Sequence, residues 1–455
     1  MNDAYYAFPC HRLEISEFIK ERGSAMQIHV VQPGDTVFQL ANTYLISPDA
    51  IISANELDSP DNLVVGQALV IPIVGQFYFV QEGDTLFSIA QRFNISTEEL
   101  AQINNISMEG ILPIGLRIYI PPRPKRPITS NGYIQPFGET VSETLENAAQ
   151  KNAPYLTYLS LFSYEVNRDG TLNPPPLGNL RQTAAENNTA LIMVVTNLEE
   201  GGFSTELASI IFNVQAVQNT LLDNIVNTAE ANGFTDVHFD FEYVSQDDRE
   251  AYNTFLRRAK ERFSQAGLLL STALAPKVSA DQQGLLYEAH DYRVHGEIAD
   301  MVVLMTYEWG YTYSPPMAVS PIDQVRRVIE YAVTDIPPEK ILLGQNLYGY
   351  DWTLPFEEGG PGATAVSPQR AIEIARTHQS AIKYDTTAQA PFFRYTDNEG
   401  NEHEVWFEDA RSIQAKFDLI REFNLLGIAY WKLGLAFPQN WLLLNDQFTI
   451  TKLTS

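Results

Sequence analysis

The sequence predicts an α/β protein in which two small βααβ modules precede a (β/α)8 TIM barrel with a small β-rich insertion between barrel strands 7 and 8. Three observations support this prediction: an internal repeat of 49 residues, a proline-rich segment after it, and eight short apolar segments that alternate with amphipathic helical stretches. The expected parts are a poorly ordered leader at 1–25, modules at 26–73 and 77–122, a linker at 123–128, and the barrel at 129–455 with its insertion at about 353–410.

The composition argues against several kinds of partner. Among 455 residues, 56 acids stand against 30 bases, and the formal charge of −26 disfavours nucleic acid and an anionic membrane surface. The sequence contains no run of about 18 apolar residues, so it predicts no membrane-spanning helix. The single cysteine, Cys10, cannot form an internal disulfide, and no metal or cofactor site is indicated. We expect a monomer with a neutral substrate.

The first 25 residues do not have the pattern of a secretory signal. They mix acids and bases, such as Glu14 and Lys20, and lack a continuous apolar stretch. The periodic pattern begins only after Met26, an alternative start of the protein. We therefore expect synthesis without a cleavable signal peptide.

The internal repeat is in register over its whole length. The sequence HVVQPGDT at 29–36 is echoed by YFVQEGDT at 78–85, and Asn55 and Asn104 also stand 49 positions apart. Each unit has the pattern of a strand, a Gly-Asp-Thr turn, a helix, a second helix capped by Ser or Thr, and a closing strand. The first helices are expected at Val37–Tyr44 and Leu86–Phe93.

These motifs resemble the LysM module, which binds the N-acetylglucosamine residues of peptidoglycan or chitin. The resemblance implies a groove between the Gly-Asp-Thr turn and the loop after the second helix, formed by 34–37 with 55–57 and by 83–86 with 104–106. Residues 26–122 contain ten acids and two bases, which suits a neutral sugar. Spacer modules without a ligand are the alternative. The implied glycan-binding residues are Gly34, Asp35, Thr36, Asn55, Gly83, Asp84, Thr85 and Asn104.

Beyond the proline-rich segment PPRPKRP at 121–127, the pattern is typical of repeated βα units. Eight units in about 330 residues predict a (β/α)8 barrel with its active site at the C-terminal ends of the strands. Pro- and Gly-rich turns and alternating segments between Asp351 and Ala410 predict the insertion, which we expect to form a wall of the substrate cleft. The predicted strands are Gly132–Pro136, Leu156–Phe162, Ala190–Thr196, Asp236–Tyr243, Leu268–Ala275, Met301–Tyr307, Ile341–Leu347 and Gly427–Trp431.

The fourth predicted strand, DVHFDFEY at 236–243, alternates ionisable and apolar residues. In a barrel its apolar side chains would face the outer helices, and its ionisable ones would face the barrel axis. Carboxylates near the C-terminal end of such a strand are typical of catalytic groups. A solvated strand face is the alternative. The inner set is Asp236, His238, Asp240 and Glu242, and the outer set is Val237, Phe239, Phe241 and Tyr243.

Four strand ends together resemble glycoside hydrolase family 18, which includes chitinases and endo-N-acetylglucosaminidases. The resemblance rests on DFE at 240–242, MTYE at 305–308, LGQNLYG at 343–349 and Trp431. It covers the whole large domain. The family's longer acidic pattern, D-x-x-D-x-D-x-E, departs here at Thr235 and His238, and Glu308 stands where the family has Asp.

The resemblance implies retaining, substrate-assisted cleavage, in which the sugar's own 2-acetamido oxygen is the nucleophile. Glu242 would protonate the leaving oxygen, Asp240 would orient the acetamido N–H, and Tyr307 would donate to the acetamido oxygen. Trp431 would form an apolar floor under the sugar ring. His238 is either a partner of Asp240 or a buried structural residue. The other expected substrate contacts are Met305, Glu308, Gln345 and Tyr348, and Trp309 and Trp352 are either site or core residues.

The modules, the barrel and the tail from Tyr430 to Trp441 are together similar to the spore cortex-lytic N-acetylglucosaminidases of endospore formers. This similarity implies hydrolysis of spore cortex peptidoglycan or its fragments during germination, by a protein located in the spore. The alternatives are a chitinase or chitooligosaccharide hydrolase, a catalytically inactive lectin-like binder, and an inert spore-coat component. The presence of Glu242, Asp240 and Tyr307 favours the enzyme.

Overall fold

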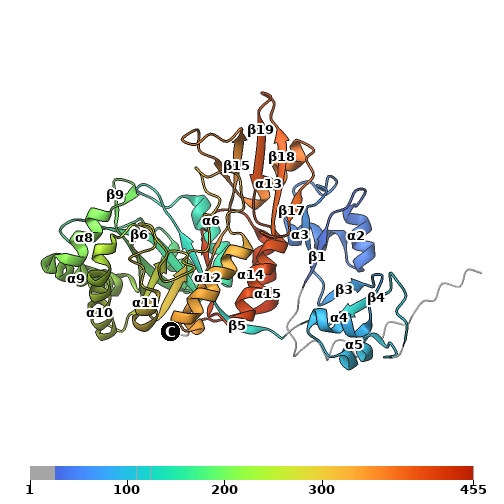
Figure 1. Ribbon diagram of the computed structural model, residues 1–455, viewed down its shortest axis with the longest axis horizontal. Coiled ribbons are helices and arrows are strands. Elements are labelled where there is room, and N and C mark those ends of the chain that lie inside the picture. Colours follow the sequence, from blue (N-terminus) through green and yellow to red (C-terminus); the bar gives the residue numbers. More distant parts are fainter. Residues whose placement is uncertain (1–25, 109, 123, 454–455) are drawn as a thin grey trace, which may run out of the picture.

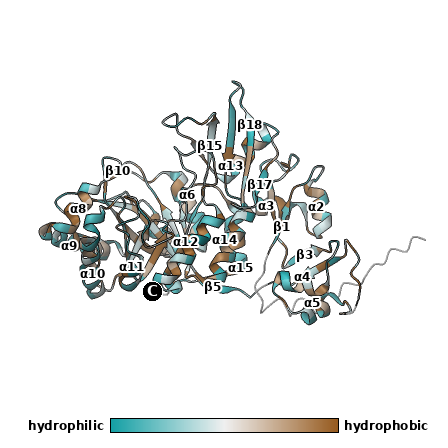
Figure 2. Cartoon of the chain, viewed as in Figure 1, coloured by the Kyte–Doolittle hydropathy of each residue, from teal (hydrophilic) through white to brown (hydrophobic). Residues whose placement is uncertain are grey.

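The computed structural model describes residues 26–108, 110–122 and 124–453, so the predicted leader lies outside the described part of the chain. Figure 1 shows the barrel at one end of the molecule, the insertion above it, and the two modules at the other end. Teal and brown residues alternate along the outer helices of the barrel in Figure 2, as expected of helices with one buried face. Within the described ranges, every helix is too short or too polar to cross a membrane.

Each module is a βααβ unit, as predicted. The side chains of Thr36 and Thr85, the last residues of the Gly-Asp-Thr turns, cap the first helices. The first module comprises β1 (Gln27–Val30), α2 (Val37–Tyr44), α3 (Pro48–Asn55) and β2 (Ala68–Ile71). The second comprises β3 (Gln76–Phe79), α4 (Leu86–Phe93), α5 (Thr97–Asn104) and β4 (Arg117–Ile120).

Eight parallel strands close into a barrel, which confirms the predicted fold class. The barrel closes because the first strand, β5, pairs in parallel with both β6 and β20. All eight predicted strands are present, with bounds that differ at several ends. They are β5 (Arg126–Ile134), β6 (Tyr158–Val166), β8 (Ala190–Thr196), β11 (Asp236–Asp240), β12 (Leu269–Leu274), β13 (Met301–Leu304), β14 (Ile341–Asn346) and β20 (Gly427–Trp431).

Strand β5 begins inside the predicted linker, so the linker prediction is wrong at its C-terminal end. Arg126 and Pro127 pair in parallel with an unpredicted strand, β21 (Phe448–Ile450). Proline is tolerated here because, among the described residues, this part of β5 pairs with β21 alone; the pairs with β20 and β6 begin at Thr129 and Asn131.

The outer helices cover the apolar face of the barrel. Phe239 of β11 lies 5.3 Å from Phe255 and 5.8 Å from Phe263 between ring centroids, and Val237 and Phe241 belong to the same core. Tyr243 differs from the prediction, because the strand ends at Asp240 and this residue turns outward with φ of 53°. The helices are α6 (Glu143–Asn152), α7 (Leu180–Glu186), α8 (Thr205–Asn213), α9 (Gln215–Asn232), α10 (Arg249–Gln265), α11 (Tyr292–Ile298), α12 (Ile322–Asp335), α14 (Ala410–Glu422) and α15 (Pro438–Gln447).

The insertion between β14 and β20 is a five-stranded antiparallel sheet with one helix, α13 (Pro368–Thr377). It begins at Gly349, four residues before the predicted start. It has a hydrophobic core of its own, which also includes Val64 of the first module. Its strands, in spatial order, are β16 (Thr364–Val366), β15 (Gly349–Leu354), β19 (Glu402–Trp406), β18 (Ala390–Thr396) and β17 (Lys383–Asp385). Three short strands, β7 (Leu172–Asn173), β9 (Leu198–Glu199) and β10 (Gly202–Phe203), follow β6 and β8.

Candidate active site

A cavity of about 480 Å³ lies at the C-terminal ends of the barrel strands, where this fold class places active sites. The insertion contributes Tyr350 and Ala365 to its wall, as predicted. Of the nine residues expected in the catalytic domain's site, the seven that line the cavity are Asp240, Glu242, Met305, Tyr307, Glu308, Tyr348 and Trp431.

The carboxyl groups of Asp240 and Glu242 are held in a poorly hydrated environment. Asp240 is buried, and its Oδ1 has no hydrogen-bond partner among the described residues. Burial raises the pKa of Asp240. Burial, reinforced by the negative charges of Asp240 and Glu308, also raises the pKa of Glu242 well above its usual range. A carboxyl group that keeps its proton near neutral pH is suited to act as a general acid.

Asn197 holds the main chain of Glu242 and was missed by the sequence reasoning. It directly follows β8 and is fully buried. Its Nδ2 donates to the Glu242 carbonyl at 2.9 Å, and its Oδ1 accepts from the Glu242 N–H at 3.0 Å. The position of Asn197, a polar residue at a barrel strand end, was the available signal. The Asn197 side chain therefore fixes the position of the main chain at Glu242, two residues after the end of strand β11.

Replacing Asn197 by Ala is expected to lower kcat about tenfold, because Glu242 loses both main-chain contacts and a misplaced acid transfers its proton poorly. The KM should change less. Steady-state kinetics with a soluble glycan would measure both, with Asn173→Ala, an exposed asparagine outside the cavity, as the control. An unchanged kcat in a folded N197A protein would show that Asn197 does not position Glu242.

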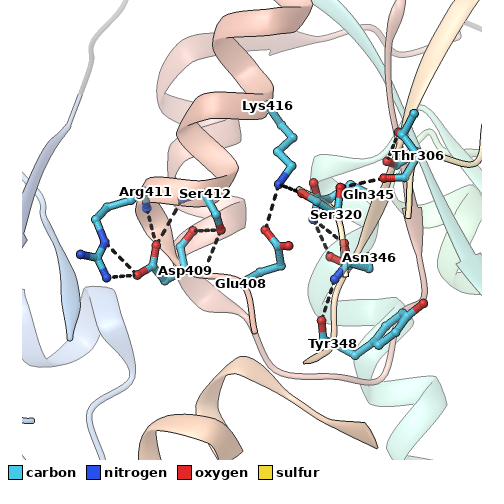
Figure 3. Close-up of polar contacts among 11 residues, drawn as sticks. Thr306, Ser320, Gln345, Asn346, Tyr348, Glu408, Asp409, Arg411, Ser412 and Lys416 are labelled. Carbon is cyan, nitrogen blue, oxygen red and sulfur yellow. Dashed lines mark hydrogen bonds and ion pairs between the residues drawn. The ribbon is translucent and has the colours of Figure 1, made fainter. Parts of the chain in front are cut away.

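Tyr307 follows strand β13, and the residue before it, Thr306, is held by a buried polar network (Figure 3). Thr306 Oγ1 donates to the Gly344 carbonyl, and Ser320 Oγ donates to the Thr306 carbonyl, both at 2.7 Å. Lys416 Nζ of α14 in turn donates to the Ser320 carbonyl at 2.7 Å and lies 3.4 Å from Glu408 Oε2. The network connects the ends of β13 and β14, which border the cavity, to helix α14.

Gln345 does not line the cavity, and its prediction as a substrate contact is corrected. Its side chain is fully buried, and its Nε2 donates to the carbonyl of Asn346 at 2.7 Å (Figure 3). Asn346 Nδ2 donates to the Tyr348 carbonyl at 2.6 Å. These amides therefore shape the turn that presents Tyr348.

His238 also lies below the cavity and does not bond to Asp240. Its ring nitrogens contact Tyr133 Oη at 2.9 Å and Ser271 Oγ at 2.8 Å, and Ser271 Oγ donates to Asp236 Oδ1. Burial lowers the pKa of His238 to about 3, so the ring is neutral. Of the two sequence interpretations, the buried structural histidine fits, because His238 stands two residues deeper in the barrel than Asp240.

Aromatic side chains support the cavity from below and from the side. Trp431 packs edge-on against Phe162 at 4.8 Å and Tyr133 at 5.5 Å between ring centroids, which leaves part of the indole exposed. Trp309 lines the cavity. Trp352 is instead a core residue of the insertion, where its Nε1 donates to the Ser314 carbonyl at 2.8 Å.

Glu308 is oriented by two tyrosines of the cavity wall. Its Oε1 accepts hydrogen bonds from Tyr348 Oη and, at 3.1 Å, from Tyr350 Oη. Because Tyr350 belongs to β15, the insertion fixes the direction of this carboxylate. The longer side chain at the family's Asp position thus reaches the wall of the cavity.

In the modules, most polar side chains of the predicted grooves have structural partners. Asn55 is fully buried and Asn104 half-buried, and they exchange hydrogen bonds with the main chain of Val70 and Tyr119. Both asparagines therefore have a structural role, and sugar contacts by them stay a prediction. Asp35 and Asp84 accept from main-chain N–H groups within their turns, and Thr36 and Thr85 cap helices. A Cβ at Gly34 or Gly83 would meet no atom within 4 Å, so the main chain of both turns is accessible.

A closed parallel barrel with two neighbouring carboxyl groups of raised pKa and a tryptophan at its strand ends is typical of a glycoside hydrolase. Residues 131–436 match the glycosyl hydrolases family 18, and residues 29–72 and 78–121 match the LysM domain. The chain belongs to glycoside hydrolase family 18 and carries two LysM domains, which together imply binding of a glycan that contains N-acetylglucosamine.

Several relatives share this whole arrangement. The chain is 64% identical to the cortical fragment-lytic enzyme of Bacillus subtilis (strain 168), over 94% of this chain and 100% of the relative. It is 53% identical to that of Bacillus anthracis, over 94% of this chain and 99% of the relative. The crystal structure of the spore cortex-lytic enzyme SleL of Bacillus megaterium QM B1551 superposes with a TM-score of 0.86 at 52% identity, covering 95% of this chain and 100% of that chain.

Proposed function

We propose that the protein is an N-acetylglucosaminidase that hydrolyses spore cortex peptidoglycan or its fragments during germination. The observation that carries this proposal is the pair Asp240 and Glu242. Both carboxyl groups line the cavity at the mouth of the barrel, and burial raises the pKa of each. The cortical fragment-lytic and cortex-lytic relatives, which match over nearly the whole chain, support the cortex as substrate. A location in the spore follows from the same relatives, and we propose that the protein acts as a monomer without a cofactor.

The proposed reaction has two steps. In the first, Glu242 gives its proton to the glycosidic oxygen while the acetamido oxygen of the same sugar bonds to C1, so that the C1–oxygen bond breaks and an oxazolinium ion forms. In the second, the Glu242 carboxylate removes a proton from water, whose oxygen attacks C1 and reopens the oxazolinium ring. The sugar keeps its anomeric configuration, and Glu242 regains its proton.

The other cavity residues stabilise the charge that develops on the acetamido group. Asp240 lines the cavity and would accept the acetamido N–H, and its negative charge would favour the oxazolinium ion. Tyr307 lies in the same cavity and would donate to the acetamido oxygen. Trp431 would hold the sugar ring by its exposed face.

The experiment that tests this function is mass analysis of purified cortex fragments after incubation with the protein, with the Glu242→Gln variant as the blank. The expected products carry N-acetylglucosamine at the new reducing end. Products that end in muramic acid would contradict the proposal. Cleavage of chitooligosaccharides alone would identify a chitinase, and binding of cortex without cleavage would identify a lectin-like protein.

A further inference from the structure

Lys432 stands apart from the other residues of the cavity. It is the one basic side chain among the described residues that line it, whereas three lining residues are acids. Lys432 directly follows Trp431 and reaches the end of the first barrel strand, where its Nζ donates to Gln135 Oε1. The ammonium also lies 5.1 Å from the ring centre of Phe137 and 5.6 Å from that of Trp431.

The ammonium of Lys432 has N–H donors that find no protein partner among the described residues. An ammonium has three N–H donors, and one of them is used by Gln135. No carboxylate of the described residues forms an ion pair with Lys432, so its charge is balanced only by an amide oxygen and aromatic faces. Partial burial of this charge is unfavourable, and a ligand oxygen in the cavity would offset that cost through a charge-assisted hydrogen bond.

The role of Lys432 rests on the proposed function. If an N-acetylglucosamine unit lies over Trp431 for cleavage, both of its neighbours in alternating peptidoglycan are muramic units. A muramic unit differs from N-acetylglucosamine by a lactyl ether on O3, which ends in a carboxyl-derived group with at least one carbonyl oxygen. Chitin has only a hydroxyl there. The difference between the two polymers therefore lies beside Trp431, where Lys432 is placed.

We propose that Lys432 is a specificity-determining residue that donates a hydrogen bond to the lactyl carboxyl oxygen of the muramic unit next to the cleaved sugar. The contact favours peptidoglycan over chitin, because chitin offers no acceptor of this kind at O3.

The test compares Lys432→Met, which keeps the unbranched stem of the side chain but not the ammonium, with Lys432→Arg, which keeps its charge. In a Glu242→Gln background, calorimetry would measure binding of a peptidoglycan tetrasaccharide and of chitotetraose. Lys432→Met is expected to weaken binding of the peptidoglycan oligosaccharide at least about tenfold. It should change chitotetraose binding less than about twofold, and Arg should restore part of the difference. Equal losses for both sugars, or no loss, would overturn this inference alone. If the wild-type protein, which has Glu242, failed to cleave peptidoglycan, the proposed function would be overturned instead.

The two modules carry a second, independent inference, because they differ in what covers their predicted grooves. In the first module, the loop after α3 packs against the large domain. Gln369 Nε2 donates to the Asn55 carbonyl at 3.0 Å, Arg376 pairs with Asp58 at 2.6 Å, and Ile382 N donates to the Val65 carbonyl at 2.9 Å. The approach is close, since a Cβ on Gly66 would lie 1.8 Å from the Ile382 carbonyl oxygen.

In the second module, the described residues of the matching loop include exposed apolar side chains. Met108, Ile111 and Ile114 are 53%, 96% and 71% exposed. Phe87 beside the Gly-Asp-Thr turn is 63% exposed, and its counterpart Phe38 in the first module is 67% exposed, so the two modules differ in this loop and not at the turn. In the first module, 49 positions earlier, Asn62 stands in place of Ile111. Exposed apolar side chains on both sides of a groove suit the ring faces and acetamido methyl groups of a neutral glycan.

We infer that the second module captures the glycan and that the first is a spacer fixed to the insertion. The test is co-sedimentation of the full chain, in the Glu242→Gln background, with insoluble cortex. Ile111→Ser with Ile114→Ser is expected to weaken binding at least about tenfold, whereas the matched pair Asn62→Ser with Val65→Ser should change it less than about twofold. Equal losses from the two pairs, or a greater loss from the first-module pair, would overturn this division of roles. Thermal unfolding would establish that both proteins are folded.

Discussion

Replacing Glu242 by Gln is expected to reduce hydrolysis of cortex fragments by about 10²–10⁴-fold, because glutamine has the shape of the acid but no proton to give. Binding should persist, since Trp431, Tyr307 and Asp240 are unchanged. The measurement is kcat from product release, together with binding of the same fragments. Glu250→Gln, an exposed change on helix α10, is the matched control. Near-normal turnover by the Glu242→Gln protein would mean that another group protonates the leaving oxygen.

The pH profile provides a second readout of the same role. Glu242 must be protonated to act as the acid, and burial raises its pKa, so the wild-type protein should stay active at pH values where an ordinary glutamate is already ionised. Activity should then fall as the pH rises through this raised pKa. Weakening the negative charge nearby, as in Glu308→Gln, should lower the pKa of Glu242 and move this fall to lower pH.

Replacing Lys416 by Met is expected to destabilise the large domain by about 3–5 kcal/mol at neutral pH, because Glu408 would remain buried without its cation. Burial already raises the pKa of Glu408. Loss of Lys416 would raise it further above the value in the unfolded chain. The penalty is then present above the unfolded pKa and shrinks as the pH falls towards it. Thermal unfolding at pH 7 and pH 5 would measure both effects.

The double variant Glu408→Gln with Lys416→Met separates the charge from the loss of contacts. It should recover much of the stability, since no buried charge remains. Lys383→Met, at an exposed position of the insertion, is the control. A Lys416→Met protein as stable as the wild type would show that the pair contributes nothing. The catalytic rate should fall as well, because Lys416 supports the Ser320 and Thr306 carbonyls that precede Tyr307.

The sequence was sufficient for features that depend on local pattern. The alternation in β11 correctly separated the apolar side of Phe239 from the side of Asp240, because a strand side chain has only two directions. It could not find the partners of His238, since Tyr133 and Ser271 come from strands far apart in the sequence.

Long-range pairing also explains the errors. Gln345 lies at the predicted strand end, but its amide donates to the carbonyl of the next residue, Asn346. Asn197, which binds the main chain of Glu242, belongs to no recognisable sequence motif. Pro127 is typical of a linker. It is acceptable in strand β5 because, among the described residues, this part of the strand pairs on one side alone, with β21. Packing of the first module on the insertion depends on the Gly66 and Ile382 main chains, which have no sequence pattern.

Because β5 pairs with β20 and β21, the barrel can close only after the C-terminal strands have been synthesised. A ribosome makes Arg126 long before Phe448, its partner, so the first barrel strand emerges with one side unpaired and must wait for residues from the far end of the barrel. An open strand edge invites pairing with other nascent chains. Arg126 and Pro127 make this edge a poor template, because one is charged and the other lacks an N–H. Pro127, which makes this strand resemble a linker in the sequence, thus disfavours intermolecular pairing of the nascent chain until the barrel closes.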